Sequence, residues 1–284
     1  MKKACLAVLA LLPLILGLPQ VASATTPKIA VIVLENQAYS KIIGSPSAPY
    51  MNSLLAQGRA ISDYHAITGG SAHDYRAMVA GETSVTKGGP NLFRAIGDPN
   101  WISLQESMAG NCGEHTSAVV PGTSVPLYTH GHDPAFMYRS NDACQTNDVP
   151  LVSDSQFGSL PAFTFITPNM CDDIHTYPKT GGKCPSYFGS VSGSNAVAIG
   201  DAWLSHVVPL LVAAGETVFI TFDEGGSGEL QHVYAVQVGA GVTPGSADGA
   251  RYDHYGLLAG LYGAFNLGPA PNNGGSASGL PIPS

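Results

Sequence analysis

The stretch that most constrains this chain is an apolar run, residues 218–222, that ends abruptly in Asp223-Glu224 and two glycines. An uninterrupted run of β-branched and aromatic residues is typical of a strand that is buried on both faces of an α/β sheet. The two acids would then lie at the carboxyl end of this strand, where such sheets bind their ligands. The run therefore predicts one wall of a cation-binding site.

A second apolar run, residues 29–34, ends in the same way, in Glu35-Asn36. A third apolar run, residues 162–166, is followed by a polar stretch that includes Asp173 and His175. Oxygen ligands gathered at strand ends suit a hard divalent metal ion, whereas histidines favour zinc or iron. We expect a divalent metal ion as cofactor, and the pattern leaves its identity and number open.

Segments with helical patterns alternate with these runs. We expect helices over 50–56, 72–80, 194–214 and 252–265, and further strands over 59–67 and 233–238. This alternation predicts a single α/β domain with a mostly parallel central sheet and helices on both faces. Pro209 is expected to kink or end its helix. The other expectations are a short helix over 101–109, a strand over 116–120, and loop or irregular structure over 82–100, 121–150 and 181–193.

The first 24 residues read as a secretory signal peptide. Lys2 and Lys3 precede an apolar run, residues 6–18, and Ala-Ser-Ala at 22–24 provides a small-residue cleavage site. The run is too short to predict an integral membrane anchor. We therefore expect a secreted or periplasmic protein, with its domain over residues 25–267 and a flexible tail rich in Gly, Pro, Asn and Ser over 268–284.

The net charge limits which partners the protein can bind, and the cysteine content indicates the cellular compartment. Removal of the two signal-peptide lysines changes the formal net charge from −8 to −10, which argues against nucleic acid as a partner. The four cysteines that remain favour disulfides over a thiolate site in an exported chain. Three pairings are possible, and sequence order suggests Cys112 with Cys144 and Cys171 with Cys184.

Five motifs together resemble a known family, the bacterial secreted phosphoesterases of the acid phosphatase and phospholipase C type, within the alkaline phosphatase superfamily. The resemblance runs from residue 28 to about residue 267. The motifs are Val33-Leu34-Glu35-Asn36, Ile166-Thr167-Pro168-Asn169-Met170-Cys171-Asp172-Asp173-Ile174-His175, Gly200-Asp201-Ala202-Trp203-Leu204, Phe219-Ile220-Thr221-Phe222-Asp223-Glu224-Gly225 and Asp253-His254-Tyr255. Their order and spacing imply an alkaline phosphatase-like fold and phosphoester hydrolysis.

The resemblance also implies roles for individual residues. It assigns metal binding to the acids and the amide at the two strand ends. It implies that three further residues at the rim are metal ligands, as for Asp173 and His254, or acid–base groups, with Asp201 in support. The metal-binding set is Glu35, Asn36, Asp223 and Glu224, and the rim residues are Asp173, His175 and His254. His132, in His132-Asp133-Pro134-Ala135-Phe136, loosely matches a family histidine that precedes Asn-Pro-Phe.

The presumed nucleophile lies where the chain departs from the family. The usual Thr-His-Pro-Ser-Leu-Pro-Asn-Tyr is replaced by Thr68-Gly69-Gly70-Ser71-Ala72-His73-Asp74-Tyr75. Ser71 keeps the nucleophile position, and Thr68, His73 and Asp74 are expected on the substrate side of the turn. His73 could compensate for the missing Asn, and Asp74 would repel a phosphate unless it is protonated, turned away or bound to metal. The alternative for Ser71 is a simple helix cap.

The sequence thus predicts a secreted, metal-dependent acid phosphatase that acts on a phosphorylated small molecule or a phospholipid. Ser71 would attack phosphorus, a phosphoserine would form, and water would release it, while His175, His132 or His254 protonates the leaving alcohol. Two alternatives remain open: a phospholipase C-type diesterase, and a non-enzymatic member that binds a phosphorylated ligand.

Overall fold

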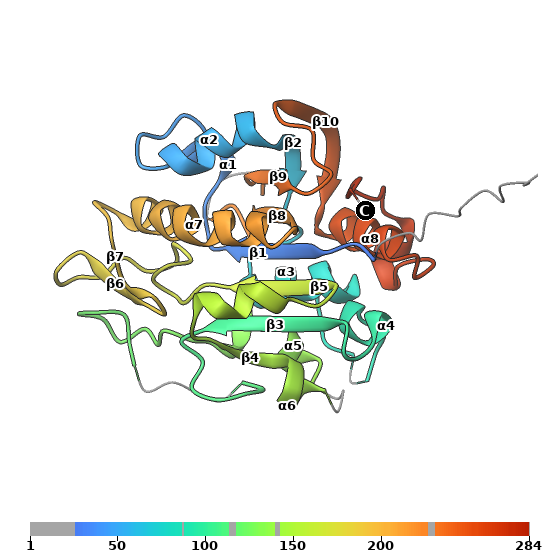
Figure 1. Cartoon of the computed structure of the whole chain (residues 1–284), viewed down its shortest axis with the longest axis horizontal. Coiled ribbons are helices and arrows are strands. Elements are labelled where there is room, and N and C mark those ends of the chain that lie inside the picture. Colours follow the sequence, from blue (N-terminus) through green and yellow to red (C-terminus); the bar gives the residue numbers. More distant parts are fainter. Residues whose placement is uncertain (1–25, 87, 114–117, 140–142, 227–230, 284) are drawn as a thin grey trace, which may run out of the picture.

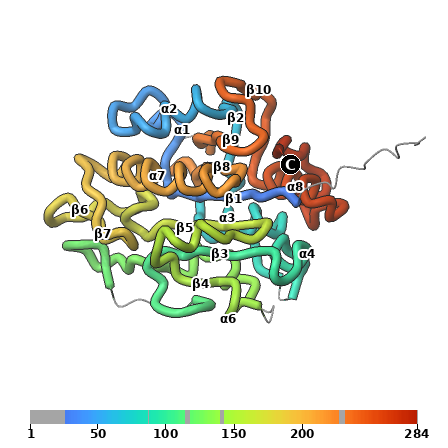
Figure 2. Tube along the Cα trace, viewed as in Figure 1, coloured from blue at the N-terminus to red at the C-terminus, as the bar shows by residue number. Residues whose placement is uncertain are grey.

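The computed structural model describes residues 26–86, 88–113, 118–139, 143–226 and 231–283. Figures 1 and 2 show a central sheet with its strands side by side and helices in front of it and behind it. The signal peptide predicted for residues 1–24 lies outside the described residues, so the structure does not test it.

Eight strands form the central sheet, and one of them, β9, runs antiparallel to its neighbours. The order across the sheet is β10-β2-β9-β8-β1-β5-β3-β4. The bounds are β1 Ile29–Leu34, β2 Arg59–His65, β3 Trp101–Glu106, β4 Asp148–Leu151, β5 Phe163–Thr167, β8 Thr217–Phe222, β9 Ala235–Gly239 and β10 Ser246–Asp253. The mostly parallel α/β sheet is confirmed.

The two apolar runs form the centre of this sheet. Every residue of β1 and β8 is buried, and the two strands pair in parallel from Ile29 opposite Thr217 to Leu34 opposite Phe222. Strand β5 flanks β1 on the other side and is buried throughout. Because the three strands are parallel, their carboxyl ends lie at one edge, and the polar residues that follow them come together there.

Helices cover both faces, as predicted. Helices α2 and α7 pack against each other in front of the sheet in Figure 1, and α3 packs against α8. The helix bounds are α1 Tyr39–Ile42, α2 Pro49–Gln57, α3 Ser71–Ala80, α4 Leu92–Ile96, α5 Pro134–Met137, α6 Cys144–Asn147, α7 Ala196–Ala213 and α8 His254–Ala264. Short 3-10 helices are η1 His130–His132, η2 Asp154–Ser159 and η3 Asn272–Ser276.

Helix α7 is long and apolar enough, with a mean hydropathy of 1.6, to fit a membrane span by length and composition. It packs against α2 and β8 in this structure, with Trp203 fully buried, as a core helix does. Pro209 does not end the helix, which continues to Ala213. The carbonyl that loses its hydrogen bond at this proline belongs to Ser205, which is exposed and can therefore be hydrated.

The helix predicted over 101–109 is wrong, because Trp101–Glu106 forms strand β3 between β4 and β5. The residues 101–109 have a composition that a helix would tolerate, but five of the six strand residues are buried in the sheet. The polar Gln105 is accommodated there because its Nε2 donates to Ser103 Oγ at 3.0 Å and to Thr167 Oγ1 at 3.2 Å. Tertiary pairing therefore overrides local preference.

Smaller corrections concern the loops. Residues 181–193 contain a hairpin of β6 Lys183–Ser186 and β7 Gly189–Ser192, and residues 82–100 contain α4. The irregular stretch 121–150 contains η1, α5, α6 and the start of β4. Of the strand predicted over 116–120, residues 116 and 117 lie outside the described residues, and Val119 forms only an isolated bridge with Pro126.

The C-terminal segment packs against the domain, in contrast to the flexible tail expected over 268–284. Leu280 is fully buried, and its N–H donates to the carbonyl of Gly256 in α8 at 2.9 Å. Gly81, which ends α3 with φ +69°, lies so close to this segment that a Cβ there would come within 2.4 Å of the Pro271 carbonyl. The segment buries apolar surface despite its polar composition.

Both disulfides suggested by sequence order are present. Cys112 pairs with Cys144, with 5.2 Å between their Cα atoms, and Cys171 pairs with Cys184, with 5.7 Å. The second bond joins the loop after β5 to hairpin β6–β7. It therefore anchors the segment that carries Asp173.

Candidate active site

Three carboxylates meet at the carboxyl edge of the central strands. Glu35 follows β1, Asp223 follows β8, and Asp173 lies in the loop after β5, and all three are fully buried. The loops are joined by backbone hydrogen bonds from Glu35 N to Asp173 O at 2.8 Å and from Asp223 N to Leu34 O at 2.9 Å. The sequence prediction that the acids after separate strands share one site agrees with this arrangement.

Asn36 turns the chain at this edge and links two of the acids. Its φ of +58° lies in the left-handed region, which asparagine tolerates better than most residues. Its N–H donates to Asp223 Oδ1 at 2.9 Å, and its Nδ2 donates to Glu35 Oε2 at 3.1 Å. Asn36 therefore holds the Asp223 carboxylate through its backbone and the Glu35 carboxylate through its side chain.

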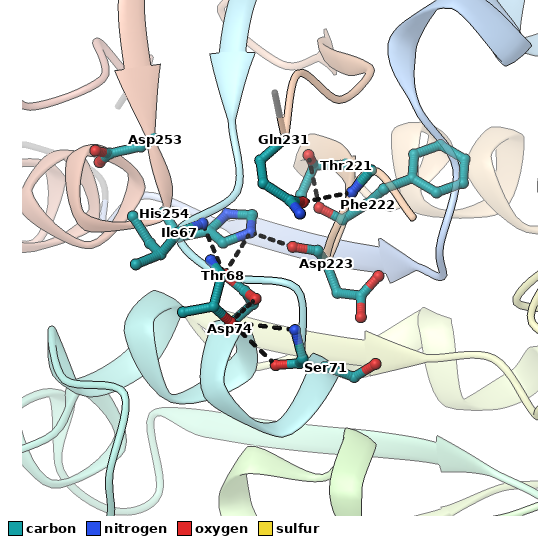
Figure 3. A network of polar contacts seen from close by, with 12 residues as sticks. Ile67, Thr68, Ser71, Asp74, Thr221, Phe222, Asp223, Gln231, Asp253 and His254 are labelled. Atoms are coloured by element: carbon teal, nitrogen blue, oxygen red, sulfur yellow. Dashed lines mark hydrogen bonds and ion pairs between the residues drawn. The ribbon is translucent and has the colours of Figure 1, made fainter. Parts of the chain in front are cut away.

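Ser71 lies at the first position of α3 and points into this cluster. Its Oγ donates to Glu35 Oε2 at 3.0 Å, and Figure 3 shows its side chain and that of Asp223 directed toward the same space. The cap position belongs to Gly70, which has no side chain to cap the helix. The alternative that Ser71 is only a helix cap therefore does not fit. No side chain caps the first turn of α3, and uncapped N–H groups at a helix start favour an anion.

His132 approaches the acids from the opposite side. Its Nδ1 lies 3.3 Å from Glu35 Oε1 and 3.5 Å from Asp173 Oδ2. Its ring stacks on Tyr75 of α3, with 5.4 Å between the ring centroids and 4° between the ring planes. Glu35, His132 and Asp173 thus offer ligand atoms that lie within 4.8 Å of one another.

The loop that carries Asp173 is strained. Ile174 has φ +84°, which is unusual for a β-branched residue, and the next N–H, from His175, donates to Asp173 Oδ1 at 2.7 Å. Helix α7 leaves room for this loop through Gly200, where a Cβ would come within 2.3 Å of the Ile174 side chain. The motif around Gly200 therefore supports the site through packing.

Burial and mutual repulsion dominate the electrostatics. Burial raises the pKa of Glu35 and of Asp173 well above the ordinary carboxyl range, and Asp223 adds to both shifts. Burial also raises the pKa of Asp223, and burial with repulsion from Asp223 raises the pKa of Glu224 to about 7. Burial lowers the pKa of His132 to about 4, against an opposing effect of Asp223. Such a cluster is unfavourable unless a cation neutralises it.

The donor set fits a divalent metal ion. Within this cluster, four buried carboxylate oxygens have no hydrogen-bond partner among the described residues: Glu35 Oε1, Asp173 Oδ2, Asp223 Oδ2 and Glu224 Oε2. Unpartnered buried charges of one sign, with an amide and an imidazole beside them, are the ligands that divalent ions take from proteins. The residues present therefore suit the predicted cofactor, and the ion's identity is not fixed by them.

His254 was expected as a metal ligand, but both of its ring nitrogens are engaged elsewhere. It is fully buried, with Nδ1 3.0 Å from Tyr64 Oη and Nε2 2.6 Å from the carbonyl of Asp223. Figure 3 shows the ring between Asp74 and the backbone of Asp223. In this arrangement His254 positions the end of β8 and does not present a nitrogen to the acids.

Asp74 is turned away from the site. This is one of the three conditions, given above, under which an acid at this position would not repel a phosphate. Its Oδ1 accepts hydrogen bonds from the N–H groups of Ile67 and Thr68, and its Oδ2 accepts from Thr68 Oγ1 at 2.7 Å. Thr68 and Asp74 thus brace the turn that presents Ser71. His73 lies on the exposed side, with its Nδ1 3.2 Å from where a Cβ on Gly70 would be.

Two other expected residues have different surroundings. Asp201 accepts hydrogen bonds from the N–H groups of Tyr50 and Met51, so it caps α2 and does not contact the rim residues. His175 is exposed, with its Nδ1 2.7 Å from Thr176 Oγ1 and its ring centroid 5.8 Å from that of His132. It is therefore the predicted histidine that faces solvent beside the acids.

Sequence reasoning missed two residues that shape the site. Tyr64 of β2 contacts His254, and Tyr75 of α3 stacks on His132. The position of Tyr75 in the nucleophile motif was a usable signal, whereas nothing in the sequence around Tyr64 points to a histidine that is 190 residues away.

No protein-family model matches the chain. By sequence it is 26% identical over 282 residues to a phosphatidylinositol-3-phosphatase of Mycobacterium tuberculosis, a match that covers 94% of this chain and 85% of that protein. It is 28% identical over 280 residues to a probable acid phosphatase of Kluyveromyces lactis, covering 89% of this chain and 61% of the relative. It is 24% identical over 245 residues to a phosphate-repressible acid phosphatase of Penicillium chrysogenum, covering 76% and 54%.

Solved structures match the fold at low identity. An alkaline phosphatase superfamily protein from Vibrio parahaemolyticus superposes with a TM-score of 0.55 at 14% identity, covering 88% of this chain and 70% of that one. The lipoteichoic acid synthase LtaP from Listeria monocytogenes gives a TM-score of 0.57 at 10% identity, covering 90% and 75%. The chain thus shares its fold with a solved protein of the alkaline phosphatase superfamily, and the relatives that it resembles by sequence are named as phosphatases.

Proposed function

We propose that the protein is a secreted, metal-dependent phosphatase that hydrolyses phosphomonoesters through a phosphoserine. The observation that carries this proposal is the hydrogen bond of 3.0 Å from Ser71 Oγ to Glu35, at the start of a helix and beside three fully buried acids. A hydroxyl so placed can be activated next to bound metal while the helix end attracts a phosphoryl group. The sequence relatives, which are named as phosphatases, support the same reaction.

The acids that follow β1 and β8 would hold the metal ion, together with Asn36, and Asp173 and His132 would add ligands on the other side of Glu35. A divalent ion bound there would lower the pKa of the serine hydroxyl and neutralise charge on the phosphoryl oxygens. Direct support for metal binding would be a stoichiometric ion in the purified protein. Glu35→Gln is expected to lose that ion, measured by elemental analysis, whereas the exposed-site control Ser205→Ala retains it.

The protein side chains account for the bond changes. Ser71 Oγ forms a bond to phosphorus as the bond from phosphorus to the alcohol oxygen breaks, with the serine proton passing to Glu35 Oε2. The N–H groups at the start of α3 stabilise the phosphoryl oxygens. The alcohol oxygen takes a proton from His175. A water molecule then loses a proton to His175 and attacks phosphorus, the bond from phosphorus to Ser71 Oγ breaks, and Glu35 returns its proton to Ser71 Oγ.

The test of the nucleophile is Ser71→Ala. We expect it to abolish release of nitrophenol from nitrophenyl phosphate, while Ser205→Ala on the exposed face of α7 keeps full turnover. A burst of nitrophenol or a trapped phosphoserine, detected by mass spectrometry of the acid-quenched wild-type protein, would identify the intermediate. Unchanged turnover in Ser71→Ala would overturn the assignment.

The role of His175 has a separate test, which depends on the leaving group. A general acid matters more for an alkoxide than for nitrophenolate, which leaves without a proton. We therefore expect His175→Gln to reduce kcat for an alkyl phosphate by about 10²-fold or more and to change kcat for nitrophenyl phosphate much less. Equal losses on both substrates would contradict the acid role.

Monoesters are favoured over diesters because the curated relatives are named as phosphatases. Bis(nitrophenyl) phosphate, assayed beside nitrophenyl phosphate, distinguishes the two. Secretion is supported by the two disulfides and the predicted signal peptide. Amino-terminal sequencing of the mature protein is expected to begin near Thr25.

A further inference from the structure

A second feature lies beside the proposed site and has no part in the chemistry at phosphorus. It is a cavity of about 750 Å³ between α3, the loop before α4 and the segment that contains η1 and α5. Arg76 and Arg139 contribute positive charge to its wall, while Val85, Phe136 and Met137 contribute apolar surface. The volume falls in the range of pockets that hold a small organic ligand.

Two elements of the proposed site also form the wall of this cavity. Gly131 lines the cavity and is followed directly by His132, whose Nδ1 lies 3.3 Å from Glu35. Arg76 follows Tyr75, which stacks on His132. Ser71 and Arg76 are both on α3, about 7.5 Å apart along the helix axis. Arg76 also lies about 140° around the helix from Ser71. The buried His132–Tyr75 pair lies between the two along α3, so a substrate that occupied both places would have to pass around this pair.

The two guanidinium groups have contacts at the cavity wall, and neither forms a close ion pair with a described carboxylate. Arg139 lies over the ring of Phe136, 4.3 Å from its centroid, and Arg76 Nη1 donates to the Thr83 carbonyl at 3.2 Å. Within the described ranges neither forms an ion pair, and Arg76 Nε is buried without a partner. The Glu82 carboxylate accepts hydrogen bonds from Thr86 and Tyr138, and the charge of Arg76 is among the causes that lower the Glu82 pKa, so Arg76 has one anionic neighbour beyond ion-pair distance.

We propose that this cavity binds a second anionic group, a phosphate or phosphodiester, carried by the alcohol portion of the substrate. The inference rests on the proposed function for its catalytic meaning. Guanidinium groups bind phosphate oxygens through several hydrogen bonds at once, and the apolar surface of Phe136, Val85 and Met137 suits the carbon skeleton between the two charged groups. The cavity thus selects bisphosphates and phosphorylated phosphodiesters over simple monoesters.

The test uses Arg139→Gln, with Arg76→Gln as a second variant and Arg251→Gln, an exposed arginine on β10, as the matched control. Binding of a sugar bisphosphate to each variant in the Ser71→Ala background is measured by calorimetry, which does not depend on turnover. We expect Arg139→Gln to weaken binding about tenfold, the loss of one charge-assisted contact, and Arg251→Gln to leave binding unchanged. Thermal melting of each variant separates lost binding from lost folding.

Turnover then identifies the ligand. In the Ser71-containing protein, the KM for nitrophenyl phosphate should be unchanged by Arg139→Gln, while the KM for a sugar bisphosphate or a short-chain phosphoinositide rises. A rise for the bisphosphate alone assigns the cavity to a phosphomonoester, and a rise for the phosphoinositide alone assigns it to a lipid-headgroup diester. Unchanged binding and KM for both in both folded variants would overturn this inference, whereas absence of turnover on every substrate by wild type would overturn the proposed function only.

Discussion

Glu216 provides a test of the electrostatics far from the proposed site. It immediately precedes β8, about 23 Å along the strand from Asp223 at 3.3 Å per residue. Its side chain is fully buried, and neither carboxylate oxygen has a hydrogen-bond partner among the described residues. Burial raises the pKa of Glu216 to about 7, and Lys28 opposes the shift in part. We predict that Glu216→Gln stabilises the protein at pH 8.

The sign and size follow from proton linkage. The folded protein binds the Glu216 proton more tightly than the unfolded chain does, so this group's contribution to stability is greatest below the unfolded pKa of about 4.5 and falls as pH rises to about 7. The folded and unfolded pKa values of Glu216 differ by about 2.5, and each pKa unit corresponds to about 1.36 kcal/mol. The stability that Glu216→Gln can gain at pH 8 is therefore at most about 3.4 kcal/mol. Water penetration reduces it, and we expect about 1–2 kcal/mol, or roughly 2–8 °C in Tm.

The assay compares the free energy of unfolding by urea for wild type and Glu216→Gln at pH 4.5 and at pH 8. The variant should gain stability relative to wild type at pH 8 and lose most of that advantage at pH 4.5. Glu82→Gln is a control for which the expected change in stability at pH 8 has the opposite sign. Hydrogen bonds from Thr86 and Tyr138 lower the pKa of Glu82 although burial opposes them, so removing its charge should destabilise the protein. A Glu216→Gln effect that is equal at both pH values, or a loss of stability at pH 8, would refute the reasoning.

Three further predictions concern the loops around the site. Replacing Cys171 and Cys184 by Ser removes a disulfide between residues 13 positions apart in the sequence. Urea denaturation should show that the free energy of unfolding falls by about 3 kcal/mol. A fall below about 0.5 kcal/mol would mean that the loop is ordered without the disulfide. Gly200→Ala would drive a Cβ against Ile174 and should lower both Tm and kcat. Asp201→Ala removes the cap of α2 and should lower stability by about 1 kcal/mol with kcat unchanged; a large fall in kcat would restore the supporting role expected from sequence.

The contrast between Gly200 and Asp201 shows how neighbouring motif residues can serve different purposes. Gly200 gives the strained Ile174 loop its space, whereas Asp201 holds a helix on the far side of α7. A motif that matches a family marks both positions equally. Their separate roles become visible only when the partners of each are known.

The sequence by itself determined the sheet and its acidic edge. Short uninterrupted runs rich in β-branched and aromatic residues favour buried strands, and parallel strands that lie side by side end at one edge. The local pattern therefore predicted that Glu35 and Asp223 lie at the same edge of the sheet. Other features depend on contacts between residues that are far apart in the sequence, and only the tertiary structure decided these. Residues 101–106 became a strand because the sheet buries them, and His254 became a positioning residue because Tyr64 and the Asp223 carbonyl occupy both of its nitrogens. A histidine's chemistry depends on the atoms around its ring, and those atoms come from distant parts of the chain.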